Sequence, residues 1–298
     1  MNIPITLTVS MAAALLGTIL RKVYTDKTGG STAAVFLFNG IGSLVAALIL
    51  FFWGGISSIS PFTLILGAVF GLVTAIQTVT NLKALEVGPL SYTTVIISCS
   101  TLISAISGAL FFDETLAVAH IIGILLMLVS FALAVERKAD EKKASARWLI
   151  YCLVAFFCTG GIGIMQKVHQ SSAFKEELNA FLVIAFAISF VFSMLCAAYL
   201  ARKERTTSHP ISVKGGMLWL LVGVMLIAGA CIAVNNKLNL YLSGVMDSAV
   251  FFPIVNGGGL VLTTLAALVL FREKLTLKQW IGMICGIGSV IFLCNPFA

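Results

Sequence analysis

The chain consists of long stretches of uncharged, mostly apolar residues, with only short charged segments between them. A helix needs about 20 such residues to cross the hydrocarbon core of a bilayer. The longest stretch, Gly29–Leu82, holds two such lengths on either side of Trp53–Pro61. The sequence therefore predicts ten membrane-spanning helices, at residues 3–23, 32–53, 61–82, 87–112, 116–135, 147–168, 178–201, 214–238, 246–271 and 277–294.

The composition also indicates an all-α membrane protein. Charged residues make up 10% of the chain and hydrophobic residues 59%, against about 25% and about 45–50% in ordinary soluble domains. Strands of a membrane barrel would be about ten residues long and would alternate strictly. The stretches in this chain are twice that length and do not alternate, and the segments between them are too short for a separate soluble domain.

The charges and cysteines exclude several classes of function. The net charge of +7 does not indicate nucleic-acid binding, because the basic residues lie between hydrophobic helices. All seven cysteines fall within predicted helices, without the spacing of a metal site. The sequence also contains no phosphate-binding loop and no nucleophile motif. We therefore expect no cofactor, no metal and no enzymatic activity.

The chain contains an internal duplication. The pattern Phe-x-Glu-x-Leu at 112–116 recurs at 271–275, and at this offset six of the nineteen positions from 112 to 130 are identical. The sequence predicts two five-helix repeats, at residues 1–140 and 146–298. Because five is odd, the second repeat enters the membrane from the opposite side, which gives inverted repeats. Such repeats place a substrate site near the midplane of the bilayer.

Basic residues are distributed unevenly between the two sides of the predicted membrane protein. Sixteen of the 19 lysines and arginines follow the first, third, fifth, seventh and ninth helices, and three follow the others. Cytoplasmic segments carry the excess of lysine and arginine. The sequence therefore predicts that both termini face outward.

The predicted helix at 246–271 contains residues that disfavour a regular helix. Pro253 lacks a backbone donor, and Asn256 is followed by three glycines that begin with Gly257. A break inside a membrane is tolerated only beside protein or a water-filled cavity. We expect a break here and a polar interior beside it, with Pro253, Asn256 and Gly257 in contact with the substrate.

The repeat partner of this helix, at 87–112, is rich in hydroxyl groups. Tyr92, Thr94 and Ser98 are candidate substrate ligands on a hydroxyl-lined wall. Hydroxyl and small residues also let membrane helices pack closely, so packing remains the alternative.

Amides and lysines form a second set of candidates. Gln77 and Asn81 lie one turn apart on the third predicted helix, and Asn236 and Lys237 close the eighth. Substrate binding is one interpretation for all four residues. The alternatives are hydrogen bonds to neighbouring helices for the amides and an interfacial position for the lysine.

Four charged residues are candidates for gating. Lys22 and Lys167 occupy matching positions at the ends of the first and sixth helices, and Glu86 and Asp247 lie at the starts of the fourth and ninth. Interfacial anchoring and helix capping are the alternative roles. Glu114 and Glu273, in the repeated motif, are expected to hold the start of the next helix. Gly67-x-x-x-Gly71 and Gly282-x-x-x-Gly286 predict close packing within the chain, with a dimer face as the alternative.

This architecture resembles the drug/metabolite transporter superfamily. The resemblance is closest to bacterial proteins with two EamA-type repeats, on the motif Glu-x-Leu-x-x-x-x-x-Ile-Gly at Glu114–Gly123 and Glu273–Gly282. It implies a multi-pass protein of the bacterial cytoplasmic membrane. It also implies transport of amino acids, sugars, nucleotide derivatives or organic cations, often by exchange or proton coupling. The first predicted helix lacks the glutamate that small multidrug-resistance relatives use for cation efflux.

The sequence thus predicts a secondary transporter, an exporter or exchanger, for a small polar metabolite such as an amino acid. Efflux of hydrophobic organic cations is the alternative. The expected partners are a small-molecule substrate, the lipid bilayer and a coupling proton, without nucleic acid, and the expected state is a monomer or weak homodimer.

Overall fold

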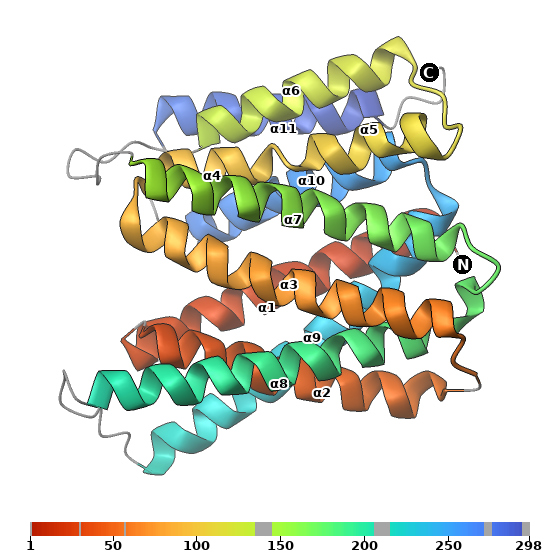
Figure 1. The fold of residues 1–298 in the computed structure, drawn as a ribbon. Helices are drawn as coiled ribbons and strands as arrows, with labels where there is room; N and C mark the ends of the chain where they lie inside the picture. The colour runs from red at the N-terminus through yellow and green to blue at the C-terminus, as the bar shows by residue number, and fades with distance from the viewer. Residues whose placement is uncertain are drawn as a thin grey trace. The chain divides into compact units, whose positions relative to one another are not determined.

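The computed structural model describes residues 2–29, 31–56, 58–134, 145–205, 215–270 and 276–293 (Figure 1). Within these ranges every regular element is a helix. The elements are α1 (Ile3–Thr28), α2 (Thr32–Gly54), α3 (Pro61–Val87), α4 (Leu90–Ser98), α5 (Thr101–Phe111), α6 (Val118–Ala134), α7 (Ala146–Gln170), the short 3₁₀-helix η1 (Lys175–Glu177), α8 (Leu178–Arg205), α9 (Gly215–Val245), α10 (Ser248–Leu270) and α11 (Leu277–Leu293).

The expected ten-helix membrane protein is confirmed. In the described residues, eight helical stretches are long and apolar enough to cross a membrane, and α4 and α5 together supply one of them, Tyr92–Phe111. The two shorter apolar helices, at Val118–Leu133 and Leu277–Leu293, supply the remaining spans. Each of the ten spans lies at a position that the uncharged stretches predict.

Several helices extend beyond the apolar stretch that marks them in the sequence. The first was predicted to end at residue 23, but α1 continues to Thr28. It ends at Gly29, whose left-handed φ of 69° lets its N–H reach the carbonyl of Thr25. Helical hydrogen bonding does not require apolar side chains, so the charged last turns remain helical. Arg21 and Lys22, which the charge distribution counted with the segment after the first helix, lie well inside α1.

The helix break lies in a different span from the predicted one. α10 runs unbroken from Ser248 to Leu270 through Pro253, so the expected interruption at 246–271 is wrong. Pro253 lies in the second turn of α10, where it removes one helical hydrogen bond without ending the helix. The interruption lies between α4 and α5, where the N–H of Ser100 bonds to the carbonyl of Ile97 at 3.1 Å. This tight turn lies in a segment rich in serine and threonine, whose helix propensity is low.

The helices form two compact units. The first unit comprises Met1–Ala75 and Ser172–Tyr241, and the second comprises Ile76–Ser171 and Leu242–Ala298. In the first unit the most extensive contact joins α2 and α8, and in the second it joins α6 and α11, followed by α5 and α10. Neither unit coincides with a predicted sequence repeat, because each unit contains helices from both halves of the chain.

Glycines allow the closest helix approaches inside each unit. In the first unit, a Cβ at Gly71 of α3 would lie 2.6 Å from the carbonyl oxygen of Ala185 on α8. In the second, a Cβ at Gly286 of α11 would lie 2.8 Å from the Ser130 hydroxyl on α6. Both predicted glycine patterns therefore contribute to packing within the chain.

Candidate functional site

A cavity of about 270 Å³ lies in the first unit between α1, α2 and α9. This volume is that of roughly nine water molecules at about 30 Å³ each. It is slightly below the range of about 300–1,000 Å³ that is usual for small-molecule sites. We call it the α1–α2–α9 cavity. Its polar lining residues are Thr18, Arg21, Asn39, Asn235 and Asn236, and the remaining lining is apolar.

Small side chains on one face of α1 create the space. Ala14, Gly17 and Arg21 recur at intervals of three and four residues, which places them on the same face of a helix. All three line the cavity. Opposite them, α9 presents Cys231, whose Cβ would lie 3.7 Å from a Cβ placed on Gly17. Larger residues in place of Ala14 or Gly17 would fill the cavity.

A hydrogen-bonded network joins α1 to α9 beside the cavity. The Ser10 hydroxyl donates to Oδ1 of Asn239 at 2.6 Å. The Asn235 amide donates to the carbonyl and hydroxyl oxygens of Ser10, at 3.0 Å and 3.1 Å. Buried polar groups need such partners, and these bonds hold Asn235 in the cavity wall.

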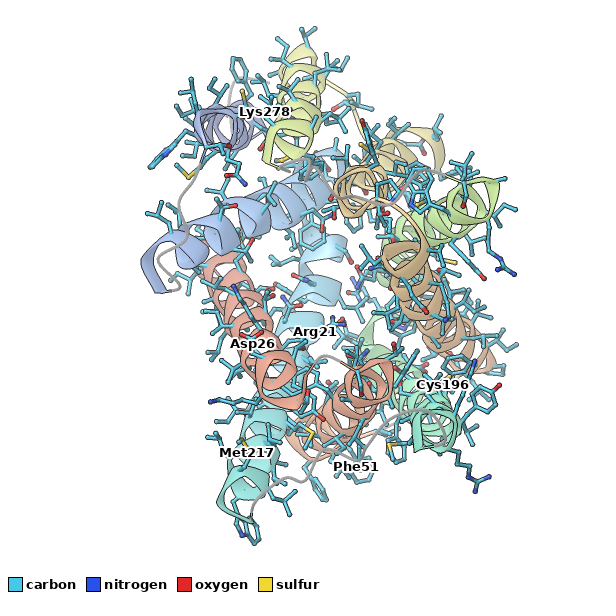
Figure 2. The ribbon with its side chains drawn as sticks, turned by 90° about the vertical axis from the view of Figure 1, so that its left-hand side faces the viewer. Arg21, Asp26, Phe51, Cys196, Met217 and Lys278 are labelled. Atoms are coloured by element: carbon cyan, nitrogen blue, oxygen red, sulfur yellow. The ribbon has the colours of Figure 1, made fainter. Side chains whose placement is uncertain are left out.

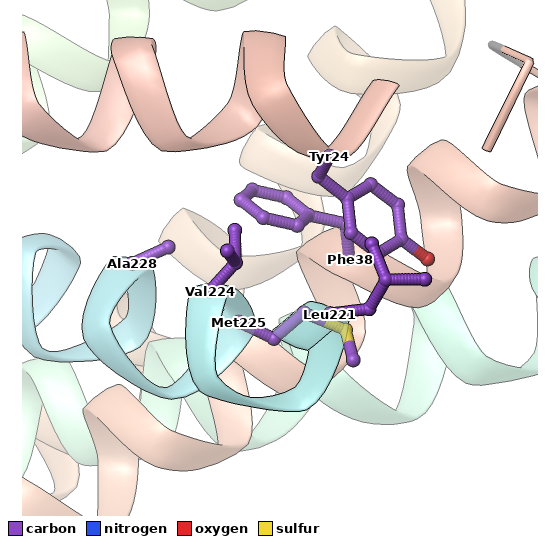
Figure 3. Packing of buried hydrophobic residues seen from close by; sticks show 6 residues of the cluster. All are labelled: Tyr24, Phe38, Leu221, Val224, Met225 and Ala228. Carbon is purple, nitrogen blue, oxygen red and sulfur yellow. The ribbon is translucent and has the colours of Figure 1, made fainter. Parts of the chain in front are cut away.

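An aromatic cluster packs beside the other end of the cavity (Figure 3). The rings of Tyr24 on α1 and Phe38 on α2 have centroids 4.9 Å apart and are tilted by 43°. They pack against Leu221, Val224, Met225 and Ala228 of α9. Phe38 and Ala228 also line the cavity, so this cluster and the cavity share a wall. Ser10 lies opposite Asn235 and Tyr24 opposite Leu221, so α1 and α9 run antiparallel.

The cavity has free hydrogen-bonding capacity. In the part of the chain that the structure describes, the Arg21 guanidinium has no ion pair and the Asn39 amide has no hydrogen-bond partner. The Asn236 amide donates to the Ile232 carbonyl at 2.9 Å. Arg21 is labelled in Figure 2, on α1. A cation and neighbouring amides can together bind a polar solute through directed hydrogen bonds.

Three of the predicted residues lie in this unit, and one of them lines the cavity. Asn236 lines it, and its role in substrate binding stays a prediction. Lys237, the next residue, lies elsewhere, with Nζ 4.5 Å from the centroid of the Trp53 ring, a cation–π contact. Lys22 follows Arg21 on α1, is half-buried, and is not part of the lining.

The other predicted binding residues lie in the second unit. Gln77 and Asn81 are half-buried on α3, and Thr94 and Ser98 are half-buried on α4. Tyr92 is 48% exposed. The roles of these five residues in substrate binding also stay predictions.

The predicted residues of α10 make two different kinds of contact. The Asn256 amide donates to Oγ1 of Thr101 on α5 at 2.9 Å, although Asn256 itself is exposed. Pro253 is fully buried, and a Cβ on Gly257 would overlap the Met127 sulfur. The cavity beside Pro253 measures only about 10 Å³. This part of α10 is thus occupied by close packing.

A buried ion pair in the second unit includes one of the predicted gating residues. Lys167 Nζ lies 2.5 Å from Glu114 Oε1, and 9% and 8% of the two side chains is exposed. Lys167 also donates to the carbonyl of Met246 at 3.0 Å. Glu114 accepts a bond from the N–H of Ser248 at 2.6 Å. Glu114 was expected to hold the start of the following helix, α6, but these bonds hold the start of α10.

The remaining predicted gating residues lie at exposed positions. Glu86 is exposed and pairs with Lys83 at 2.6 Å, three residues away on α3. Asp247 is exposed, and its carbonyl accepts the N–H of Phe251 at 2.8 Å in the first turn of α10. Glu273 lies outside the described residues. Among those that are described, no group of three His, Cys, Asp or Glu residues could hold a metal ion.

Sequence reasoning missed Arg21 and Asn39. Arg21 was counted among the loop residues that orient the protein, because the first helix was predicted to end two residues later. The stripe of Ala14, Gly17 and Arg21 was the available signal, since small residues one turn apart leave room for a neighbouring polar group.

Comparisons with known proteins agree with this architecture. A probable 4-amino-4-deoxy-L-arabinose-phosphoundecaprenol flippase subunit ArnE from Hamiltonella defensa is 32% identical over 107 residues, which is 36% of this chain and 87% of that protein. A solved crystal structure has the same fold with a TM-score of 0.72 and 17% identity, over 97% of this chain and 96% of that one. The expected drug/metabolite transporter type is confirmed, while the EamA-type repeats stay a prediction. Residues 12–295 match the sugar transport protein family, and the chain therefore belongs to that family.

Proposed function

We propose that this protein is a secondary transporter, an exporter or exchanger, that moves a small polar metabolite by alternating access. The observation that carries the proposal is the α1–α2–α9 cavity, in which Arg21 and asparagine amides lie between membrane-spanning helices. Ionisable groups within membrane-spanning helices are costly and rare, so their presence points to a functional site. A polar solute of small size is the ligand that matches them.

The helix contacts support a mechanism built on inverted repeats. The repeat that the sequence predicts makes α2 equivalent to α8, α6 to α11, and the α4–α5 span to α10. The most extensive contacts of the two units join α2 with α8, α6 with α11, and α5 with α10. Elements that lie next to a two-fold axis contact their own equivalents, so these pairs are those expected of two repeats related by such an axis.

The family and the relative favour a hydroxylated solute over other polar metabolites. The family is described as sugar transport proteins, and the relative is named as a subunit of an aminoarabinose-lipid flippase. We therefore place sugar-like molecules beside amino acids as substrates. Efflux of hydrophobic cations is less compatible with the cavity, because the Arg21 guanidinium would repel them.

Counterflow in proteoliposomes tests the proposed function. The purified chain is reconstituted, loaded with one solute at a time from a panel of sugars, sugar acids, sugar phosphates, amino acids and organic cations, and supplied with a labelled tracer of the same solute outside. At least one polar solute should accumulate transiently, and organic cations should not. If no member of the panel shows counterflow or binding, the proposal is wrong.

A cavity-filling variant links transport to this site. Ala14→Leu adds a branched side chain to the cavity lining and should lower the counterflow rate at least about tenfold, because the solute then competes with the side chain for space. Ala12→Leu, at an exposed position of the same helix, is the matched control and should transport normally. Equal rates in the two variants would place the substrate elsewhere.

A further inference from the structure

We infer that the substrate carries an anionic group, a carboxylate or a phosphate, and that Arg21 binds it inside the α1–α2–α9 cavity. The inference rests on the proposed transport function and narrows its substrate class. Its basis is the combination of a guanidinium without an ion pair among the described residues and the two asparagines Asn39 and Asn236 in the same wall.

The position of Arg21 argues against a purely interfacial role. It lies seven residues before the end of α1, which corresponds to about 10 Å along the helix axis at 1.5 Å per residue. An arginine that serves only as an anchor extends its side chain to the headgroups along the lipid-facing surface. Arg21 is exposed, and it shares its helix face with Ala14 and Gly17, which line the cavity with it.

The chemistry of the guanidinium selects the ligand. Arginine presents several N–H donors in a planar fork that matches the two oxygens of a carboxylate or phosphate. It has no acceptor, so the hydroxyl groups of a neutral solute can satisfy it only in part. The amides of Asn39 and Asn236 supply acceptors and donors beside it. The complementary solute is therefore small and hydroxylated, with one anionic group at one end.

The duplicated sequence offers a natural comparison. The offset that relates Lys22 to Lys167 relates Arg21 to Gln166, so the second repeat carries a neutral residue at the equivalent position. The positive charge of this site is thus particular to the first repeat. Gln is tolerated at the same place in the repeat, which makes Arg21→Gln a conservative way to remove the charge.

The experiment compares matched solutes in proteoliposomes that contain the full chain. A neutral hexose, the corresponding uronic acid and the corresponding hexose phosphate share a ring and differ in charge, and the two acids separate the carboxylate source from the phosphate source. In the wild-type protein, at least one acid should support counterflow better than the neutral sugar. This comparison needs no variant, so it tests the inference even if a substitution prevents folding.

Variants then assign the preference to Arg21. Arg21→Gln should weaken binding of the acid by at least about tenfold, because the acid loses its charged hydrogen-bond donor, and should weaken binding of the neutral sugar much less. Arg21→Lys should recover part of the loss. Arg202→Gln, which removes an exposed charge at the end of α8, should behave like the wild type.

The outcomes separate this inference from the proposed function. If neutral solutes are transported and the acids are not, or if Arg21→Gln binds the acid as the wild type does, the anionic substrate is wrong and the transporter function stands. If no polar solute is transported, both fail.

Discussion

The ion pair between Lys167 and Glu114 joins two charges that are both almost completely removed from solvent. Burial of charges is costly, and the pair is stable only because each partner has further hydrogen bonds, to Met246 and Ser248. These bonds connect the end of α7 to the junction between α9 and α10. A buried ion pair contributes little net stability, whereas removing only one of its partners is strongly destabilising because the other charge stays buried.

Removing one partner of this pair should therefore destabilise the protein strongly. Lys167→Met leaves the Glu114 carboxylate buried without its cation and should cost about 3–5 kcal/mol. The thermal unfolding temperature in detergent measures the loss. Lys83→Met breaks the exposed pair with Glu86 and should cost no more than about 1 kcal/mol. Equal effects of the two variants would show that burial of the Lys167 pair does not matter.

The sequence predicted some of the residues that line the cavity and missed others. Asn236 was predicted from its place at the polar end of the eighth predicted helix, and it lines the cavity. Arg21 lay within the predicted helix at 3–23 but was counted with the charges of the following loop, because hydropathy marks where apolar residues stop and not where the helix stops. Nothing in the sequence indicates that Asn39 of α2 lies opposite Arg21, since this proximity depends on how three helices pack.

At the level of helices, uncharged runs predicted the position of each span, because the bilayer demands a fixed length of apolar residues. The interruption was predicted in the wrong span. Proline and glycine indicated α10, yet α10 is continuous, and the turn lies at Cys99–Ser100 between α4 and α5. Pro253 removes one hydrogen bond from α10 but does not end the helix. Gly257 remains helical with the Met127 side chain packed against it.

The packing of α3 against α8 leads to a prediction about helix contacts. Gly71→Ala should destabilise the protein by about 1–3 kcal/mol, because the added methyl group would lie 2.6 Å from the Ala185 backbone oxygen. Gly223→Ala on α9 meets no atom within 4 Å. This control should be neutral or stabilising, because alanine favours a helix over glycine. Thermal unfolding in detergent compares the two, and a stabilised Gly71→Ala protein would contradict the close contact.

For the whole molecule, ten spans place both termini on the same side of the membrane, and the distribution of basic residues predicts which side. A C-terminal alkaline phosphatase fusion should be active, because that enzyme needs export, and a C-terminal green fluorescent protein fusion should be dark. The opposite result would place both termini in the cytoplasm and would show that the lysine and arginine bias misleads in this chain. The prediction is independent of the substrate.

The aromatic cluster restricts how the cavity lining on α1 can move. Arg21 and Tyr24 lie three residues apart on α1, so about one turn of a single helix carries both the charged group of the cavity and one ring of the Tyr24–Phe38 contact. A rotation or slide of α1 that brings the guanidinium toward a solute must also displace the tyrosine. The position of the Arg21 guanidinium and the Tyr24–Phe38 ring contact are therefore coupled through one rigid turn of α1.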